Sequence, residues 1–171
     1  MFPYYEHMPE VHPSVFLAPG SVVTGDVKIG EDSGVWYNAV IRGDVAPTII
    51  GQRVNIQDNS TLHQSPGNPL IIEDEVTVGH NVILHSCRIG KGSLIGMGSI
   101  ILDRAEIGEF TLIGAGSLVP PGKKIPSRHL ALGNPVAVVR PLEQKDLDYL
   151  KRAVQSYVDK AKYYKNLHLK K

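Results

Sequence analysis

Residues 89–125 read IGKGSLIGMGSIILDRAEIGEFTLIGAGSLVPPGKKI, and an aliphatic residue recurs at every sixth position of this stretch. The same phase continues toward the N-terminus. It is interrupted by a three-residue insertion after Ile41, a four-residue insertion after Leu62 and the loss of one residue before Ile89. The aliphatic residues in phase are Val11, Leu17, Val23, Ile29, Val35, Ile41, Ile50, Ile56, Leu62, Ile72, Val78, Leu84, Ile89, Ile95, Ile101, Ile107, Ile113, Val119 and Ile125.

A period of six fits neither the 3.6-residue turn of an α-helix nor the two-residue alternation of an ordinary strand. It is typical of a parallel β-helix, in which short strands alternate with tight corners and about 18 residues complete one triangular coil. The alternative, a β-sandwich, would require the in-phase positions to coincide by chance. The hexapeptide pattern resembles the left-handed form, and the handedness follows from that resemblance alone. We therefore predict a mainly β protein, a left-handed parallel β-helix of hexapeptide repeats with a C-terminal α-helix.

The repeat fades after Ile125. Residues 126–141 contain three prolines and predict an extended crossing segment. Apolar residues then recur at spacings of three and four, which predicts an amphipathic helix from about Leu142 to about Leu167. We expect a β-helix domain at 1–141 and, at 142–171, a helix packed on it or on a neighbouring subunit, ending in frayed Lys170 and Lys171. The predicted apolar stripe is Leu147, Leu150, Val154, Tyr157, Ala161, Tyr164 and Leu167.

The overall composition excludes several classes of function. The 18 basic and 17 acidic residues are nearly balanced, so the chain lacks the charge excess expected of a protein that binds nucleic acid or anionic membranes. No apolar run approaches the roughly 20 residues of a membrane helix, and the N-terminus does not resemble a secretory signal. A single cysteine, Cys87, is consistent with a reducing compartment. These features predict a cytoplasmic protein.

The repeat serves as a coordinate system for the histidines. Leu84 lies one coil above Leu62, and Leu62 lies one coil above Ile41. His63 and His85 therefore share a column with Arg42, each one position after an inward aliphatic residue. Because neighbouring strands lie about 4.7–4.9 Å apart, two stacked histidines can bind one metal ion.

His80 belongs to the preceding corner of the coil, directly above Asp58. At about 3.3 Å per residue, adjacent corners lie roughly 15–20 Å apart, which is too far for His80 to share a metal with His63 and His85 of its own chain. A neighbouring chain can supply it, and a heterologous contact of this kind closes into a ring. The geometry predicts a homotrimer with metal sites at its subunit interfaces.

Three protein ligands leave one position of a zinc ion open, which is the pattern of a catalytic site. The alternative is that each histidine is an ordinary polar residue at a turn. Two histidines in one column, with a third placed where a neighbour could use it, favour the metal site. Cys87 lies two positions after His85 and is more plausibly a small buried filler than a ligand.

Several motifs resemble the γ-class carbonic anhydrases over nearly the whole chain. They are Arg42-Gly43-Asp44, Asn55-Ile56-Gln57-Asp58, His63, Gly79-His80 and His85, all on a hexapeptide prism with a C-terminal helix. The hexapeptide repeat alone is less specific, because many acyltransferases share it.

The resemblance implies a trimer that binds Zn²⁺, or Fe²⁺ or Co²⁺, through His63 and His85 of one subunit and His80 of the next. It also implies that Arg42 forms an interface ion pair with Asp44 and Asp58. Gln57 would orient the reacting hydroxide or bicarbonate, and Tyr157 would lie near the site. Alternatively, Arg42, Asp44 and Asp58 are separate solvated charges, and the two aspartates are turn residues. Gln57 could cap a turn, and Tyr157 could pack in the core.

One departure from the family concerns proton export. The archetypal member has a glutamate where this chain has Val45, and another in an acidic loop where residues 64–69 contain no carboxylate. The predicted function is reversible hydration of CO2 to bicarbonate by a metal-bound hydroxide, with turnover lowered by the missing carboxylates. The alternatives are a coenzyme-A-dependent acyltransferase or thioesterase, and a metal-stabilised structural protein with little activity.

Overall fold

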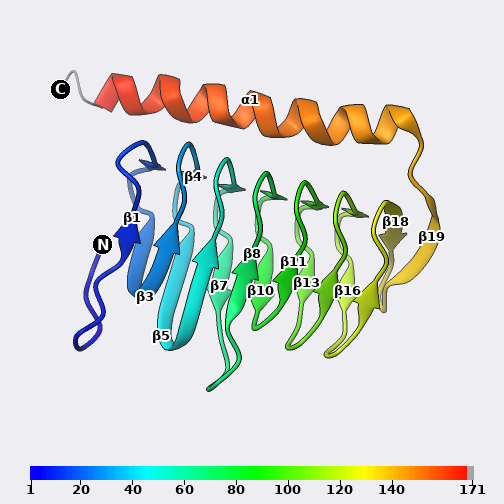
Figure 1. The fold of residues 1–171 in the computed structure, drawn as a ribbon, viewed down its shortest axis with the longest axis horizontal. Coiled ribbons are helices and arrows are strands. Elements are labelled where there is room, and N and C mark those ends of the chain that lie inside the picture. The colour runs from blue at the N-terminus through cyan, green and yellow to red at the C-terminus, as the bar shows by residue number, and fades with distance from the viewer. Residues whose placement is uncertain (169–171) are drawn as a thin grey trace.

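The computed structural model of the protein describes residues 1–168. The chain winds into a three-sided prism of stacked coils. Helix α1 (Gln144–His168) then runs back along one side, from the C-terminal end of the prism to its N-terminal end (Figure 1). The fold is the left-handed hexapeptide β-helix with a C-terminal helix that the six-residue period and the family resemblance predict.

Two sides of the prism form one sheet, which has 11 strands among the described residues. The strands are β1 (Glu10–Val11), β3 (Val22–Ile29), β5 (Val40–Ile50), β7 (Thr61–His63), β8 (Leu70–Ile72), β10 (Ile83–His85), β11 (Arg88–Ile89), β13 (Ile100–Ile101), β14 (Glu106–Ile107), β16 (Leu118–Val119) and β17 (Lys124–Ile125). The long strand β5 turns a corner, so that its first half pairs with β7 and its second half with β8.

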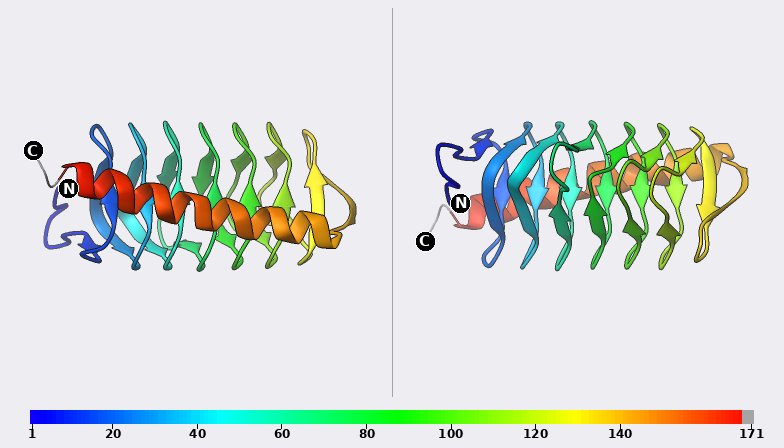
Figure 2. Two further views of the ribbon diagram at one scale, coloured as in Figure 1. Left: turned by 90° about the horizontal axis from the view of Figure 1, so that it is seen from above. Right: turned by 90° about the horizontal axis from the view of Figure 1, so that it is seen from below.

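The third side is a sheet of eight strands within the described part of the chain. They are β2 (Phe16–Leu17), β4 (Gly34–Val35), β6 (Asn55–Ile56), β9 (Thr77–Val78), β12 (Leu94–Ile95), β15 (Leu112–Ile113), β18 (His129–Leu132) and β19 (Ala137–Pro141). Helix α1 covers this side and contacts β2, β4, β6 and β9 (Figure 2).

The predicted inward positions form the core. Every in-phase aliphatic residue from Val23 to Ile125 is buried. Each pairs with its equivalent one coil away, as in Ile41 with Leu62 and Leu62 with Leu84. The insertions therefore loop out without changing the register. Val11 and Leu17 are only partly buried, because they belong to the first coil and have a neighbouring coil on one side only.

The segment after Ile125 differs from the prediction. The repeat does not end there, because Ala131 occupies the next inward position, is fully buried and pairs with Ile113. β19 then pairs antiparallel with β18. A free sheet edge exposes unpaired backbone groups, and β19 covers this edge at the end of the prism. The segment is thus a closing hairpin as well as a crossing.

Helix α1 begins two residues later than predicted, and its buried stripe differs at two positions. Val158 is buried although it lay outside the predicted stripe, whereas Leu167 is 42% exposed. Leu167 belongs to the last turn of α1, and this end of the helix extends past the first coil of the prism (Figure 1). Lys170 and Lys171 lie outside the described residues. No helix in residues 1–168 is long and apolar enough to cross a membrane. The division at residue 141 stays a prediction.

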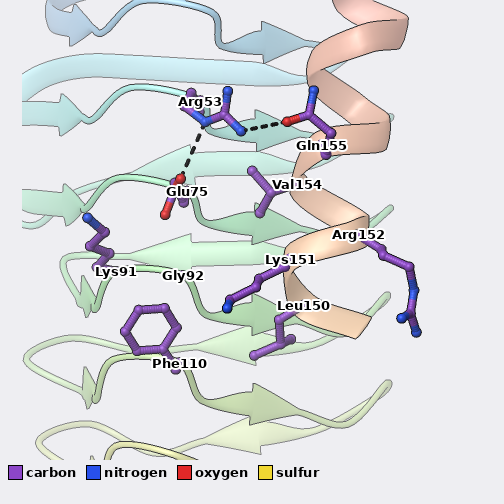
Figure 3. A pocket seen from close by; sticks show the side chains of 10 residues that line it. All are labelled: Arg53, Glu75, Lys91, Gly92, Phe110, Leu150, Lys151, Arg152, Val154 and Gln155. Atoms are coloured by element: carbon purple, nitrogen blue, oxygen red, sulfur yellow. Dashed lines mark hydrogen bonds and ion pairs between the residues drawn. The ribbon is translucent and has the colours of Figure 1, made fainter. Parts of the chain in front are cut away.

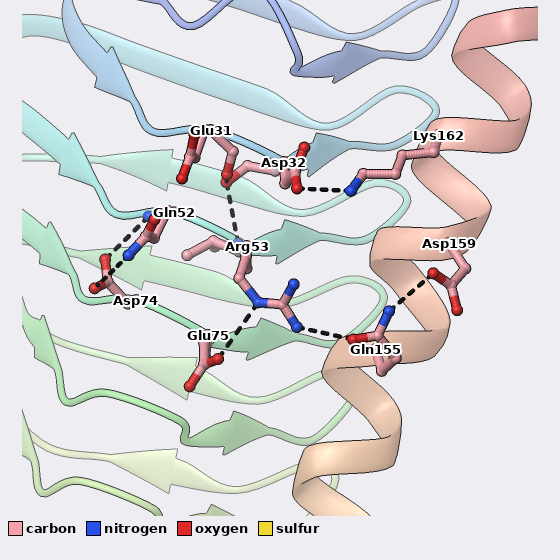
Figure 4. Close-up of polar contacts among 11 residues, drawn as sticks. Glu31, Asp32, Gln52, Arg53, Asp74, Glu75, Gln155, Asp159 and Lys162 are labelled. Carbon is pink, nitrogen blue, oxygen red and sulfur yellow. Dashed lines mark hydrogen bonds and ion pairs between the residues drawn. The ribbon is translucent and has the colours of Figure 1, made fainter.

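Polar contacts also attach α1 to one row of corners. Arg53 donates from Nη2 to Gln155 Oε1 at 3.0 Å, and Lys162 Nζ lies 2.7 Å from Asp32 Oδ2 (Figure 4). The same Arg53 side chain forms an ion pair with Glu75, with 3.4 Å between Nε and Oε1. These contacts fix which side of the helix faces the prism.

The start of α1 predicts a pH effect. Arg140 donates to both oxygens of Asp146, and the backbone N–H of Glu143 also donates to this carboxylate, so the pKa of Asp146 is lowered to about 2. A carboxylate with a lowered folded pKa stabilises the protein above its ordinary pKa and ceases to do so as the pH falls through about 2. The difference in unfolding midpoint between the wild type and Asp146→Asn should therefore close between about pH 4 and about pH 2. A difference in unfolding midpoint that does not change with pH would show that the ionised carboxylate of Asp146 is not the source of the stabilisation.

Candidate metal centre

His63 and His85 lie side by side on neighbouring strands, as their shared column predicts. They end β7 and β10 and pair directly in the register of these two strands. The two rings are partly buried, with centroids 5.3 Å apart, and His63 Nδ1 lies 3.3 Å from His85 Nε2. Two ligand nitrogens on a tetrahedral zinc with bonds of about 2.0–2.1 Å are separated by about 3.3–3.4 Å. The pair therefore has the spacing of two zinc ligands.

The outer nitrogen of each ring faces a carboxylate. His63 Nε2 lies 2.9 Å from Asp44 Oδ1, and His85 Nδ1 lies 2.5 Å from Asp103 Oδ1. Such a carboxylate holds the ring proton and fixes the tautomer, as it does for histidines that bind metals. In the neutral tautomers, both inner nitrogens then carry lone pairs that face each other. A cation between them would satisfy both, and we take this as the evidence that these residues suit a metal.

The surroundings of the two aspartates favour their ionised form. Partial burial would by itself raise the pKa of Asp103, but hydrogen bonds from Ser65 and His85 outweigh it, and the pKa is lowered. Ser65 Oγ donates to Asp103 Oδ2 at 2.5 Å. The pKa of Asp44 is likewise lowered, because contacts with His63 and Arg42 outweigh desolvation. Both carboxylates are therefore charged at neutral pH and suited to hold a ring proton.

Asp103 is a site residue that sequence reasoning missed. Leu84 pairs with Ile101 of the next coil, so counting one residue further along both strands places Leu102, and not Asp103, above His85. The loss of one residue before Ile89 shortens this coil, and Asp103 reaches His85 from the turn that follows β13. A search of the residues on either side of the predicted column would have found it.

His80 lies at a different corner, in the turn after β9. Its Nδ1 is 2.7 Å from Asp58 Oδ2, which agrees with the predicted position of Asp58 one coil below. His80 thus repeats the pairing of the other two histidines, with Nε2 left for a ligand. Within residues 1–168 no group of three or more His, Cys, Asp or Glu side chains could hold a metal. His80 does not join His63 and His85 within one chain.

Gln57 and Tyr157 are brought together with His80. All three line a cavity of about 420 Å³ between α1 and the third side of the prism, and neither His63 nor His85 lines it. Gln57 is buried, and its Nε2 donates to Asn55 Oδ1 at 3.0 Å, which leaves the amide oxygen for another partner. Tyr157 is partly buried, and its pKa is raised by burial and by the nearby carboxylate of Asp58.

Arg42 contacts one of its two predicted carboxylate partners, and it does so within its own chain. Arg42 donates to Asp44, which therefore bridges Arg42 and His63. Asp58 pairs with His80 in the same chain, and a contact between Arg42 and Asp58 across an interface stays a prediction. Cys87 is buried in the core, where burial raises the pKa of its thiol, so it is a filler and not a ligand of this pair. Val45 is exposed beside the site and supplies no carboxylate.

Comparison with known proteins identifies relatives of the whole chain. Residues 86–121 match the bacterial transferase hexapeptide family (six repeats). A protein from Geobacillus kaustophilus named carbonic anhydrase is 61% identical over 98% of this chain and 92% of its own. A mitochondrial protein from Arabidopsis thaliana named gamma carbonic anhydrase 2 is 35% identical over 92% of this chain and 59% of its own.

The chain belongs to the γ-class carbonic anhydrase family. Membership does not by itself define the reaction, because a Bacillus subtilis protein that is 60% identical over 98% of both chains is named an uncharacterized transferase. In this γ-class member, the three histidines, each with its own aspartate, are the feature that bears most directly on the chemistry.

Proposed function

We propose that the protein catalyses the reversible hydration of CO2 to bicarbonate at metal sites shared between the subunits of a homotrimer. The single observation that carries the proposal is the pair of inner nitrogens, His63 Nδ1 and His85 Nε2, 3.3 Å apart and each backed by a carboxylate. A hexapeptide transferase that binds coenzyme A has no need of two histidines held in this way.

The third ligand in this proposal is His80 of a neighbouring subunit. Its ring is held by Asp58 as the other two are held by Asp44 and Asp103. Contact between the corner that carries His80 and the corner that carries His63 and His85 joins unlike surfaces, and such contacts close into rings. Arg42, exposed beside Asp44, would then lie at the interface.

The residues of this chain have distinct roles in the proposed reaction. Zn²⁺, or Fe²⁺ or Co²⁺ with the same ligands, would lower the pKa of bound water to about 7 and so supply hydroxide at neutral pH. Asp44, Asp58 and Asp103 keep the ring protons away from the ligand nitrogens. The amide of Gln57 can accept or donate a hydrogen bond without carrying charge, which suits the orientation of a neutral substrate that becomes an anion.

CO2 is apolar, and the cavity beside His80 suits it because its walls include Leu94, Ile95 and Leu112. Tyr157 closes the cavity from α1. With Val45 and the loop at 64–69 lacking carboxylates, proton export depends on the buffer. We therefore expect turnover to rise with buffer concentration over a wider range than in an enzyme with its own proton shuttle.

The test combines metal analysis and CO2 hydration on one anaerobically purified sample. We expect hydration to fall to the uncatalysed rate after chelation, to return with Zn²⁺, and to be absent in His85→Ala. Ser156→Ala, at an exposed position of α1, is the control and should remain active. Metal-replete protein without hydration would leave a structural role for the metal. Acyl transfer from acetyl-CoA that survives chelation would instead support the transferase name of the Bacillus subtilis relative.

A further inference from the structure

The prism has three rows of corners, and His63, His80 and His85 occupy only two of them. The third row lies where the strands β8, β11 and β14 turn into β9, β12 and β15. One residue of each turn in this row has a positive φ, and these residues stack as a column: Asp32, Arg53, Glu75, Gly92, Phe110 and Arg128. Most members of the column are polar or lack a side chain, and Phe110 is the aromatic exception.

Phe110 is held in a costly conformation. Its φ is 50°, in a region that bulky residues rarely adopt. Its ring folds over Gly92, where a Cβ atom would come within 2.5 Å of it. The missing side chain at Gly92 therefore leaves a gap that the ring covers. The positive φ recurs at the equivalent position of the other turns in this column, so it belongs to the turn, and in this turn it presents an aromatic face.

A cavity of about 570 Å³ opens between this ring and helix α1 (Figure 3). Its floor is apolar, because the ring of Phe110 and the buried side chains of Leu150 and Val154 all line it. One wall is fixed, since Arg53 is held by Glu75 and Gln155 (Figure 4). The volume lies within the roughly 300–1,000 Å³ of typical small-molecule sites, and an apolar floor with a few polar groups is their usual lining.

The rim of the cavity is positively charged. Four cationic side chains line it, Arg53, Lys91, Lys151 and Arg152, against the single carboxylate of Glu75, which Arg53 already neutralises. Within residues 1–168 the ammonium groups of Lys91 and Lys151 have no carboxylate partner. The whole chain has a net charge of only +1, so this local excess is not a general property of its surface.

We propose that this cavity binds an organic anion with an aromatic body, the body on the Phe110 ring and the charged end between Lys91 and Lys151. Figure 3 shows Lys151 directed toward the cavity and Arg152 directed away from it. The site is separate from the metal centre, because it lies on the row of corners that carries none of the three histidines. It therefore does not depend on the proposed function.

The test uses 8-anilinonaphthalene-1-sulfonate, an aromatic sulfonate whose fluorescence rises in apolar surroundings, with the full-length protein. We expect saturable binding at one site per chain. Lys151→Glu should weaken it at least about tenfold, because it removes a hydrogen bond to a charged group and adds a carboxylate that repels the anion. Lys123→Glu makes the same change of net charge in the exposed turn between β16 and β17, outside the lining of the cavity, and should alter binding less than about twofold. Equal losses in the two variants, or no saturable binding to the wild type, would overturn the proposal.

A competition experiment separates the charge from the apolar body. 2-Naphthoate and 2-naphthol share one ring system and differ in a single charge. We expect 2-naphthoate to displace the probe at about one tenth of the concentration that 2-naphthol requires. Equal displacement would show that the lysines do not select an anion and would overturn that part of the proposal. Phe110→Leu keeps an apolar side chain and should weaken both competitors alike.

Discussion

Mixing His80→Ala chains with His85→Ala chains, each inactive alone, is expected to restore about one quarter of the metal sites of the wild type. A His80→Ala chain still carries the pair His63 and His85, and a His85→Ala chain still carries His80. In a mixed ring, the corner of a His80→Ala chain that carries His63 and His85 can contact the corner of a His85→Ala chain that carries His80. One complete set of three ligands then forms at that interface. No such recovery is possible if all ligands come from one chain.

The expected fraction follows from counting rings. If the two chains assemble at random in equal amounts, about three quarters of the trimers contain both, and each mixed trimer has a single intact site, so about one quarter of all sites recover. The measurements are zinc content and CO2 hydration after denaturation and refolding of the mixture. Both should recover by the same fraction, because each intact site binds metal and is active.

The matched control is a mixture of His63→Ala and His85→Ala chains. These two lesions damage the same side of the interface, so every possible pairing lacks a ligand, and we expect no recovery. Recovery in this control would contradict the assignment of His63 and His85 to one subunit. A lack of recovery in both mixtures, with trimers intact, would contradict the shared site.

Much of this arrangement could be predicted from the sequence because the β-helix is nearly one-dimensional. Each coil contacts its neighbours only, so counting residues between inward aliphatic positions gives the register directly. That is how the pairing of His63 with His85 and of Asp58 with His80 could be predicted, despite insertions of different length.

What could not be predicted depends on departures from the repeat. Ala131 is too small to stand out as an inward residue, so the last coil was missed. Val158 was missed because its burial depends on where α1 lies against the prism, which no periodicity specifies. The charged cavity over Phe110 likewise arises only when α1 is placed beside the third row of corners.

Asp103→Asn is expected to lower zinc affinity by about 10–100-fold, the usual effect of removing the carboxylate behind a ligand histidine. The substitution preserves shape but removes the charge that holds the proton on His85 Nδ1. A neutral amide can also present its NH2 group to this nitrogen, which favours the wrong tautomer and places the proton on Nε2, the nitrogen that faces His63. Competition with a chromogenic chelator measures the affinity without relying on activity.

Two further variants distinguish this role from a general loss of stability. Asp74→Asn changes an aspartate that accepts hydrogen bonds from Gln52 on the row of corners that carries none of the three candidate ligands, and it should leave zinc affinity unchanged. Ser65→Ala removes the hydroxyl that holds Asp103 Oδ2 and should cause a smaller loss than Asp103→Asn, because the charge remains. Equal losses in Asp103→Asn and Asp74→Asn would indicate destabilisation of the prism. An unchanged affinity in Asp103→Asn would mean that His85 does not bind the metal through Nε2.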